Sequence, residues 1–393
     1  MIILLVHAQI VVQLSRQTSR LGRTPFPTMP DFSSIPSSHP TPSLVIDAAT
    51  VQRNIARMSE YGASKNLKIR PHTKTHKSRL MARWQMNAGA SGLTVAKAGE
   101  AEIMAQVCED VFVAYPAIGE ARLKRITQVA REIRVRVAVD SLEAATLIDD
   151  AARQASVEMD VVIDIDVGFH RTGVVGPASA ITLAEHLGRC KNLRLLGLMC
   201  FPGHIKPNAA PETWREYADC LGEIIQQLRE KGFCTDVISG GSTPTAYQSH
   251  INGWLNEIRP GTYIYNDMNE VRLGVATLDD CAAQVLATVI SHSGKQKIVV
   301  DAGSKTLSSD RCSPDPESGW GYIVEVPQAK VVRLSEEHGE IQLPEDAVVP
   351  KIGSRITIIP NHVCVCVNLQ ETAWLYSNGE LTEFEIDARG MLV

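Results

Sequence analysis

The sequence lacks any excess of positive charge, which argues against a role on nucleic acid or on an anionic membrane surface. Its 393 residues carry a net charge of −5, whereas such surfaces attract strongly basic proteins. The nine cysteines are odd in number and scattered, without the framework of a small secreted disulfide domain. We therefore expect a cytoplasmic protein with reduced thiols and a small-molecule substrate, with no nucleic acid and no membrane as partners.

The N-terminal region also lacks the features of a membrane anchor or a signal peptide. Its apolar start, Met1-Ile-Ile-Leu-Leu-Val6, is too short for a membrane helix and has no basic region before it. Three arginines follow with no acidic residue before Asp31, so a weak organelle-targeting segment is one alternative. The interpretation that we favour is a disordered extension over residues 1–40, or a start codon assigned too early, with Met29 as the true first residue.

From residue 41 onward, short β-type runs alternate with amphipathic helical stretches, the pattern of an α/β protein. After an opening run at 43–47, the sequence predicts eight strands, at 67–72, 92–95, 110–115, 134–140, 159–166, 193–201, 236–239 and 254–265. Helical stretches lie between them, at 49–65, 78–88, 119–132, 142–155 and 211–231. Eight strand–helix units predict a (β/α)8 barrel of the TIM type over residues 41–275. An open doubly wound sheet is the alternative, but its Gly-x-Gly-x-x-Gly signature does not follow the first strand.

After residue 275 the helical periodicity nearly disappears. Runs of β type lie at 284–292, 297–301, 321–326, 330–334, 355–360 and 373–376, joined by turns rich in Gly, Pro and Asn. The sequence therefore predicts a C-terminal, mostly-β domain over residues 276–393. It leaves open whether the opening strand, within residues 41–48, contributes to that domain.

The densest basic cluster, residues 70–77, lies at the end of the first predicted barrel strand. Lys74 lies in this loop, and α/β barrels place their chemistry at the ends of strands. Its neighbours Arg70, His72, His76 and Lys77 would crowd the lysine and disfavour its ammonium form. A lysine that loses its proton readily can form an imine with an aldehyde cofactor.

Two loops near the end of the predicted barrel have the composition of a phosphate-binding site. Gly241, Ser242 and Thr243 follow the seventh strand, and Gly261 and Thr262 lie in the eighth. Glycines let backbone N–H groups approach an anion, and barrel phosphates commonly lie between the loops after strands seven and eight. The alternative is an ordinary Gly-Gly-Ser turn.

Arg259 lies between these two loops in the sequence. Inside a barrel mouth its permanent charge would have to face an acceptor, and an unprotonated pyridine nitrogen is one such acceptor. The alternative is a surface arginine on a β-type run.

A candidate metal pair lies near the C-terminus, in Pro360-Asn361-His362-Val363-Cys364. We expect a strand here, which would place His362 and Cys364 on one face. Two protein ligands suit an open site completed by water and substrate rather than a closed structural site. The alternative is a core strand with small apolar cysteines. Cys366 would lie on the same face, as a third ligand or as part of the core.

With these residues, the chain resembles the family that contains D-threonine aldolases and zinc-dependent, eukaryotic-type D-serine dehydratases. The resemblance runs from about residue 41 to the C-terminus. It rests on the motifs Arg-Pro-His-x-Lys-x-His-Lys, Asp-x-Gly-x-x-Arg-x-Gly, Gly-Gly-Ser-Thr-Pro-Thr, Asp-Ala-Gly-x-Lys, Glu-Glu-His-Gly and Pro-x-His-x-Cys. It implies a fold-type III pyridoxal phosphate enzyme with an alanine-racemase-like barrel and a β domain. It also implies a divalent metal, zinc with manganese or magnesium as alternatives, and a homodimer.

The resemblance assigns roles to individual residues. Lys74 corresponds to the Schiff-base lysine, Arg259 to the arginine that faces the pyridine nitrogen, and His362 with Cys364 to the metal pair. In an aldolase, His76 or metal-bound water would be the base. The remaining cofactor or substrate contacts are His72, Arg171, Gly241, Ser242, Thr243, Gly261, Thr262 and Tyr263.

Two departures from related enzymes narrow the activity that the resemblance implies. Racemases of this fold use a tyrosine from the second domain, and residues 266–321 contain none. Aldolases carry Asp at the position of Cys364, whereas dehydratases carry Cys. We therefore expect a lyase that converts D-serine or D-threonine to a 2-oxo acid and ammonia. The alternatives are retro-aldol cleavage to glycine and an aldehyde and, less favoured because of the β domain, a non-catalytic pyridoxal phosphate-binding protein.

Overall fold

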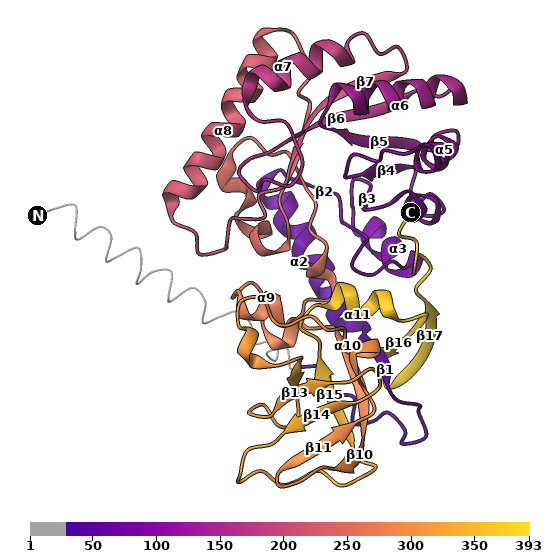
Figure 1. Ribbon diagram of the computed structural model, residues 1–393, viewed down its shortest axis with the longest axis vertical. Helices are drawn as coiled ribbons and strands as arrows, with labels where there is room; N and C mark the ends of the chain where they lie inside the picture. The colour runs from indigo at the N-terminus through magenta and orange to yellow at the C-terminus, as the bar shows by residue number, and fades with distance from the viewer. Residues whose placement is uncertain (1–28) are drawn as a thin grey trace, which may run out of the picture.

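The computed structural model describes residues 29–393 and contains two sheets, one above the other in Figure 1. The predictions for residues 1–28 lie outside this described part of the chain. No helix among residues 29–393 is long and apolar enough to span a bilayer. All nine cysteines lie in the described part, and each is a free thiol.

The upper sheet is an eight-stranded parallel barrel, which confirms the predicted fold class. Its strands follow the order β2-β9-β8-β7-β6-β5-β4-β3, and a parallel bridge between His72 and Thr94 joins the two ends of this order. The strands are β2 (Lys68–Ile69), β3 (Leu93–Val95), β4 (Asp110–Val113), β5 (Arg134–Val139), β6 (Met159–Ile165), β7 (Leu193–Cys200), β8 (Val237–Gly240) and β9 (Glu257–Ile258).

The last barrel strand is much shorter than the run at 254–265 predicted from the sequence. It ends at Ile258, and the chain continues through Arg259 and Pro260 into a 3-10 turn, η2 (Thr262–Ile264). Proline has no N–H with which to continue the hydrogen bonds of a β-sheet. The apolar residues after Pro260 therefore form a turn instead of a strand.

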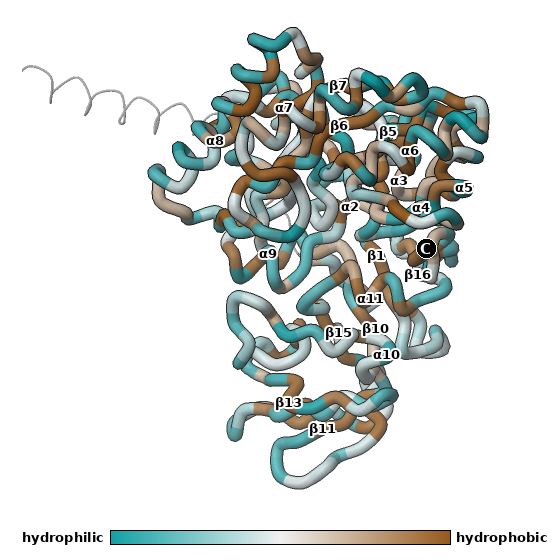
Figure 2. Tube along the Cα trace, turned by 45° about the horizontal axis from the view of Figure 1, so that its top comes forward, coloured by the Kyte–Doolittle hydropathy of each residue, from teal (hydrophilic) through white to brown (hydrophobic). Residues whose placement is uncertain are grey.

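Helices cover the outside of the barrel and bury apolar residues against it. In α6 (Leu142–Ala155) the buried residues Ala144, Ala145, Ile148 and Ala152 recur at helical spacing. Figure 2 shows hydrophobic and hydrophilic residues mixed along α6 and α8 in this way. The other helices are α2 (Ala48–Lys65), α3 (Arg79–Asn87), α4 (Ala98–Met104), α5 (Glu120–Val129), α7 (Gly176–Leu187), α8 (Pro211–Glu230), the 3-10 helix η1 (Thr243–Asn252) and α9 (Met268–Arg272).

The lower sheet is mixed and includes the opening strand of the described chain. β1 (Ser43–Asp47) pairs antiparallel with β10 (Ala283–His292) and parallel with β16 (Thr372–Ser377). The other strands are β11 (Lys297–Val300), β12 (Tyr322–Ile323), β13 (Lys330–Leu334), β14 (Gly339–Gln342), β15 (Arg355–Ile359) and β17 (Glu380–Glu385). Short helical pieces η3 (Leu278–Asp280), α10 (Ser304–Leu307) and η4 (Pro316–Ser318) connect them.

The segment after β15 corrects a prediction. Residues 363–369 form a helix, α11 (Val363–Leu369), and His362 is its N-cap. The buried side chains Val363, Cys366 and Val367 follow helical spacing. Asp267 Oδ2 accepts a hydrogen bond from the backbone N–H of Val363 at 2.9 Å. These tertiary contacts outweigh the strand propensity of the Val-Cys-Val-Cys-Val run.

Residues 29–40, the described part of the predicted disordered extension, also correct a prediction because they pack onto the lower sheet. Phe32 and Ile35 are buried with Val45 and Leu286. The ring of Phe32 lies edge-on to Tyr376, with centroids 5.3 Å apart. Burial of two large apolar side chains fixes this segment against β1 and β16.

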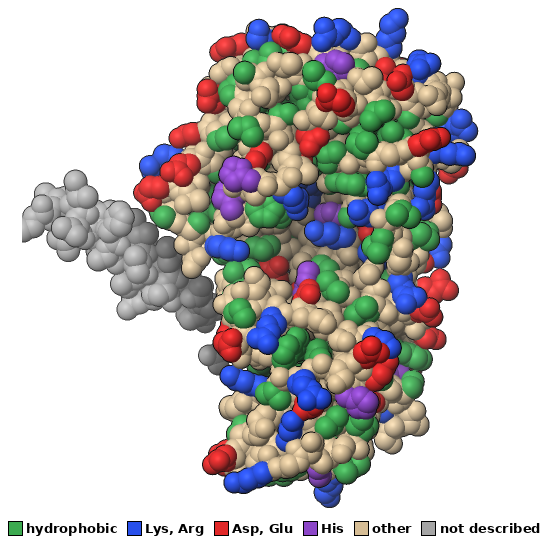
Figure 3. All heavy atoms as spheres, viewed as in Figure 1, with side chains coloured by type: hydrophobic (Ala, Val, Ile, Leu, Met, Phe, Trp, Pro, Cys, Tyr) green, Lys and Arg blue, Asp and Glu red, His purple; other side chains and the backbone are tan. Residues whose placement is uncertain are grey.

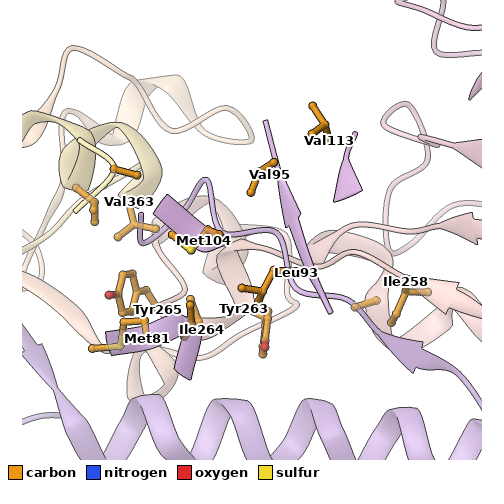
Figure 4. Close-up of a cluster of buried hydrophobic side chains, with 14 of the residues drawn as sticks. Met81, Leu93, Val95, Met104, Val113, Ile258, Tyr263, Ile264, Tyr265 and Val363 are labelled. Atoms are coloured by element: carbon orange, nitrogen blue, oxygen red, sulfur yellow. The ribbon is translucent and has the colours of Figure 1, made fainter. Parts of the chain in front are cut away.

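One hydrophobic core joins the two sheets. Figure 4 shows Leu93 and Val95 of the barrel, Tyr263, Ile264 and Tyr265 of the following turn, and Val363 of α11. All belong to a single cluster of buried side chains. The core therefore holds the start of α11 against the barrel mouth.

Candidate active site

A cavity of about 250 Å³ lies at the C-terminal ends of the barrel strands. Figure 3 shows Lys, Arg and His side chains gathered around a hollow between the barrel and the lower sheet. Loops that follow β2, β6, β8 and β9 bring most of the sequence-predicted site residues to this cavity. They are His72, Lys74, Arg171, Gly241, Ser242, Thr243, Arg259, Gly261 and Thr262.

The two glycine-containing loops approach so closely that side chains would not fit. Gly241 has φ +70°, and a Cβ there would lie 2.9 Å from Ser249 Oγ. A Cβ on Gly261 would lie 2.9 Å from Thr75 Oγ1 and 3.1 Å from the carbonyl oxygen of His72. Backbone is therefore exposed to the cavity at both loops, and Ser242 is the N-cap of η1, whose first N–H groups have no partner within the helix. This arrangement fits a phosphate group.

Thr243 and Tyr263 have supporting positions around this cradle. Thr243 Oγ1 accepts hydrogen bonds from the backbone N–H groups of Gly261 at 3.2 Å and Tyr263 at 3.1 Å, which joins the two loops. Tyr263 does not line the cavity. Its hydroxyl is buried and accepts a hydrogen bond from Gln85 Nε2 at 3.0 Å, and burial raises its pKa. The predicted contact of Tyr263 with substrate or cofactor does not fit this position.

Arg259 is a buried cation whose two hydrogen-bond partners are uncharged. Its Nη1 donates to Ser239 Oγ at 2.6 Å and its Nη2 to the carbonyl oxygen of Cys200 at 2.9 Å. No carboxylate of residues 29–393 forms an ion pair with it, and burial lowers its pKa. A guanidinium that lines a cavity without a carboxylate suits a neutral acceptor such as a pyridine nitrogen. The cavity therefore fits pyridoxal phosphate at both the cradle and the arginine.

The cations near Lys74 in the sequence do not crowd it as predicted. Arg70 points to the opposite end of the barrel, where its Nε lies 2.8 Å from Glu257 Oε2. Lys77 pairs with Glu100, with Nζ 3.2 Å from Oε1. Of the four predicted neighbours, only His72 lines the cavity with Lys74. Burial, together with the charges of Lys74 and Arg259, lowers the pKa of His72 well below its usual value, so its imidazole is neutral.

His76 lies outside the cavity, which corrects its predicted role as a base. Its Nδ1 accepts a hydrogen bond from the backbone N–H of Ser78 at 3.1 Å, and its Nε2 lies 3.1 Å from Gln85 Oε1. Both ring nitrogens are therefore occupied by the protein. Burial lowers its pKa to about 4, so the ring is neutral and braces the loop that carries Lys74.

Arg171 lines the cavity and is held by aromatic rings. Its guanidinium lies 4.5 Å from the ring centroid of Phe201 and 5.3 Å from that of Phe169. Such stacking orients a guanidinium while leaving its N–H groups in the ring plane free to donate. Within residues 29–393 no carboxylate forms an ion pair with it, so Arg171 is available to an anionic ligand.

The candidate metal pair lies beside the lysine loop. Cys364 Sγ lies 3.2 Å from Thr75 Oγ1 and 3.8 Å from Thr262 Oγ1. Burial alone would raise the thiol pKa, but His362 and Thr75 outweigh it and lower it. The neighbouring thiol in turn raises the pKa of His362 to about 9. A thiol with a lowered pKa readily becomes the thiolate that binds metals.

The orientation of His362 also fits a metal ligand. Its Nδ1 lies 2.7 Å from Asp310 Oδ2, and a carboxylate on one ring nitrogen directs the other toward a metal. No group of three His, Cys, Asp and Glu side chains among residues 29–393 is arranged to hold a metal ion. The described residues therefore offer a two-ligand, open site.

Cys366 is not the third ligand that the strand interpretation allowed. Residues two apart on an α-helix point in nearly opposite directions. Its Sγ lies 3.2 Å from the carbonyl oxygen of Thr306 in the core, and burial raises its pKa to about 12.

Sequence reasoning missed two acidic residues. Glu270 of α9 is buried and lines the cavity, and its Oε2 has no hydrogen-bond partner in the described structure. Burial, with the nearby charges of Asp267 and Cys364, raises its pKa well above the usual value. Asp267 Oδ1 caps α9 by accepting from the N–H of Glu270 at 3.1 Å. The Asp-x-x-Glu spacing is a capping signature, but only the fold shows that α9 faces α11.

Comparisons with known proteins agree with this architecture. A family model described as alanine racemase, N-terminal domain, matches residues 46–269, and one described as putative serine dehydratase domain matches residues 282–376. The D-threo-3-hydroxyaspartate dehydratase of Delftia sp. is 34% identical over 348 residues, covering 82% of this chain and 90% of the relative. The D-threonine aldolase of Arthrobacter sp. is 29% identical over 361 residues, covering 89% and 93%.

A solved structure shares this architecture. It is described as a D-threo-3-hydroxyaspartate dehydratase variant, with a cysteine replaced by alanine, in the metal-free form. The structures superimpose with a TM-score of 0.81 at 30% identity, covering 89% of this chain and 98% of that chain.

Proposed function

The chain belongs to the family of D-threonine aldolases and D-serine dehydratases, and on this premise we propose that it dehydrates D-β-hydroxy-α-amino acids. The products would be a 2-oxo acid and ammonia, and the cofactors pyridoxal phosphate and a divalent metal. One observation carries the proposal: Cys364 Sγ lies 3.2 Å from the hydroxyl of Thr75, the residue after Lys74. The loop that carries Lys74 and the proposed metal pair are therefore neighbours in space, although they are almost 300 positions apart in the sequence.

Different residues would hold the two cofactors. Gly241, Ser242 and Thr262 would receive the phosphate, Arg259 the pyridine nitrogen, and Lys74 the aldehyde carbon. When bound, pyridoxal phosphate supplies an electron sink for the negative charge that develops at the substrate Cα. His362 and Cys364 would hold the metal, zinc with manganese or magnesium as alternatives, which supplies Lewis acidity toward the β-hydroxyl group.

The protein groups would orient the substrate and move its protons. Arg171 donates to the substrate carboxylate, since its stacked guanidinium has no carboxylate of its own. Lys74 Nζ takes the proton from Cα. Burial raises the pKa of Glu270 and favours its protonated form, in which it would donate a hydrogen bond into the cavity.

A second candidate is retro-aldol cleavage to glycine and an aldehyde, and the position of His72 favours it. Cleavage requires a base for the β-hydroxyl proton. His76 lies outside the cavity, but the neutral imidazole of His72 lines it. The D-threonine aldolase relative, matched over 93% of its length, supports the same alternative.

Incubation with D-threonine separates the two reactions because this substrate can follow either route. We expect 2-oxobutyrate and ammonia, measured with the metal-loaded holoenzyme, and no product from L-threonine. If glycine and acetaldehyde form instead, the reaction is aldol cleavage and not dehydration. The protein is supplied with pyridoxal phosphate and with zinc, manganese or magnesium. If D-threonine and D-serine both remain unchanged, the protein binds the cofactor without catalysing a reaction.

We further propose a homodimer. Light scattering of the holoenzyme should then give about twice the chain mass of 42.9 kDa. A mass of a single chain at working concentration would contradict it.

A further inference from the structure

A line of buried polar groups runs through the barrel interior, from Arg259 at the cavity toward the opposite end. Arg259 Nη1 donates to Ser239 Oγ at 2.6 Å, and Ser239 Oγ donates to Glu257 Oε1 at 2.7 Å. Ser239 is fully buried, and Glu257 and Arg259 are 2% and 6% exposed. Every one of these contacts is therefore shielded from water.

The chemistry of the three groups fixes the direction of each hydrogen bond. A guanidinium only donates, so the oxygen of Ser239 must accept from Arg259. A carboxylate only accepts, so the hydroxyl proton of Ser239 must point to Glu257. Ser239 is thus locked in one orientation, and the negative charge of Glu257 polarises its oxygen toward Arg259.

Glu257 is in turn fixed from the far side. Its Oε1 also accepts from Arg136 Nη1 at 3.0 Å, and its Oε2 accepts from Arg70 Nε at 2.8 Å. Burial alone would raise the pKa of Glu257, but Arg70 and Arg136 outweigh it and lower the pKa. The carboxylate therefore stays ionised, and it cannot rotate without breaking contacts to two buried arginines.

We propose that Ser239 and Glu257 are positioning residues that hold Arg259 facing the pyridine nitrogen of the cofactor. The inference rests on the proposed function only in taking pyridoxal phosphate as the occupant of the cavity. Ser239 and Cys200 take one N–H from each terminal nitrogen of Arg259. The remaining donors are left for the cavity that the guanidinium lines. A serine in this place orients the arginine without neutralising it, as an adjacent carboxylate would.

Variants of Ser239 test the proposal through cofactor binding in the absence of substrate. Ser239→Ala removes the acceptor, and Ser239→Cys replaces it with a weaker one of similar volume. Because a hydrogen bond to a charged group is lost, we expect both to weaken pyridoxal phosphate binding about tenfold. Both should also shift the visible absorbance band of the bound cofactor. Ser239→Thr keeps the hydroxyl and should retain wild-type affinity within about twofold and the wild-type band.

Two measurements separate positioning from general loss of structure. Thr127→Val removes a buried hydroxyl on α5 that bonds only the carbonyl oxygen of Lys124, and it should change neither affinity nor band. Thermal unfolding of each variant without cofactor reports folding, and if Ser239→Ala fails to fold, Ser239→Cys decides the question.

Wild-type affinity and band in a folded Ser239→Cys or Ser239→Ala protein would overturn the proposal. A wild-type protein that takes up no pyridoxal phosphate would overturn it together with the proposed function. A shifted band in a protein without lyase activity would uphold the positioning role and refute the proposed reaction alone.

Discussion

The two ends of the barrel both hold arginines and lysines around a hollow, but they treat these charges differently. At the N-terminal end, a cavity of about 390 Å³ is lined by Lys68, Arg70, Arg134 and Arg136 together with Asp110, Asp236 and Glu257. Its three arginines each have a carboxylate within 3.0 Å. At the C-terminal end, the smaller cavity is lined by Lys74, Arg171 and Arg259, which form no ion pair within residues 29–393.

The difference shows that the pairing of charges, rather than the size of a hollow, marks the candidate site. A buried cation without a counter-ion, such as Arg259, is costly, and it persists where a ligand completes its surroundings. The paired arginines at the other end hold the strands of the barrel together, as expected for the stability face of this fold.

Removal of the amine at the mouth should have the largest effect. Lys74→Ala should lower the rate of product formation from D-threonine by at least about 10³-fold, because a base and the cofactor attachment are both lost. It should also abolish the visible band of the bound cofactor. Lys68→Ala, at the opposite end, is the matched control and should leave activity and band unchanged. Equal losses of activity in the two variants would contradict the proposed difference between the two ends of the barrel.

Breaking a pair at the N-terminal end should affect stability next most strongly. Arg70→Met leaves Glu257 with one of its two arginines and should lower the free energy of unfolding by about 3–5 kcal/mol. Arg134→Met is the matched control at the same end. Its side chain is 50% exposed, so we expect a loss of no more than about 1 kcal/mol. Denaturant unfolding measures both, and a small effect of Arg70→Met would mean that the pairing is not what holds this end together.

The lower half of the molecule contributes the proposed metal ligands to the C-terminal end of the barrel. Cys364→Ala should reduce the rate with D-threonine about 10²-fold while the cofactor band persists, because only the Lewis acid is lost. Cys366→Ala removes the buried thiol on the same helix and should keep most of the activity in the folded fraction. Treatment of the wild type with a chelator should reproduce the Cys364→Ala result. Full activity after complete metal removal would contradict the role of His362 and Cys364.

Acid should weaken the N-terminal end by a smaller, graded amount. Arg70 and Arg136 lower the pKa of Glu257 in the folded protein despite its burial. Its contribution to stability is therefore present above the unfolded pKa near 4.5 and is lost as the pH falls through the folded value. The stability difference between wild type and Glu257→Gln should narrow in acid, by at most about 1.4 kcal/mol per pH unit for one proton. A constant difference between pH 6 and pH 3 would exclude this ionisation.

The barrel could be predicted from the sequence because its strands are apolar, β-branched runs that end at turn residues. The loops after β2, β8 and β9 could be placed at one face for the same reason, since parallel strands share their carboxyl ends. The strands β14 and β17 escaped prediction because Gly339–Gln342 and Glu380–Glu385 are largely polar or exposed. Their pairing partners, rather than their own composition, make them strands.

What the sequence could not provide was the direction in which neighbouring side chains point. Arg70, Lys74 and Lys77 lie within eight residues, yet one faces the far end of the barrel, one the cavity and one α4. Helix α11 was not predicted because alternating valines are typical of a strand. The first N–H group of the helix is bound by Asp267, which is distant in the sequence. Glu270 reaches the cavity only because α9 packs where the two sheets meet.

The placement of β1 has a consequence for the order in which the protein assembles during synthesis. Residues 43–47 pair with Ala283–Leu286 and with Trp374–Tyr376, so β1 leaves the ribosome long before either partner. The barrel strands, which end at Ile258, emerge in between. Leu44, Val45 and Ile46 are buried in the finished structure but have no sheet to join until translation nears its end. An unpaired apolar strand invites aggregation, so we expect newly made chains to be most prone to aggregation before β10 and β16 have emerged.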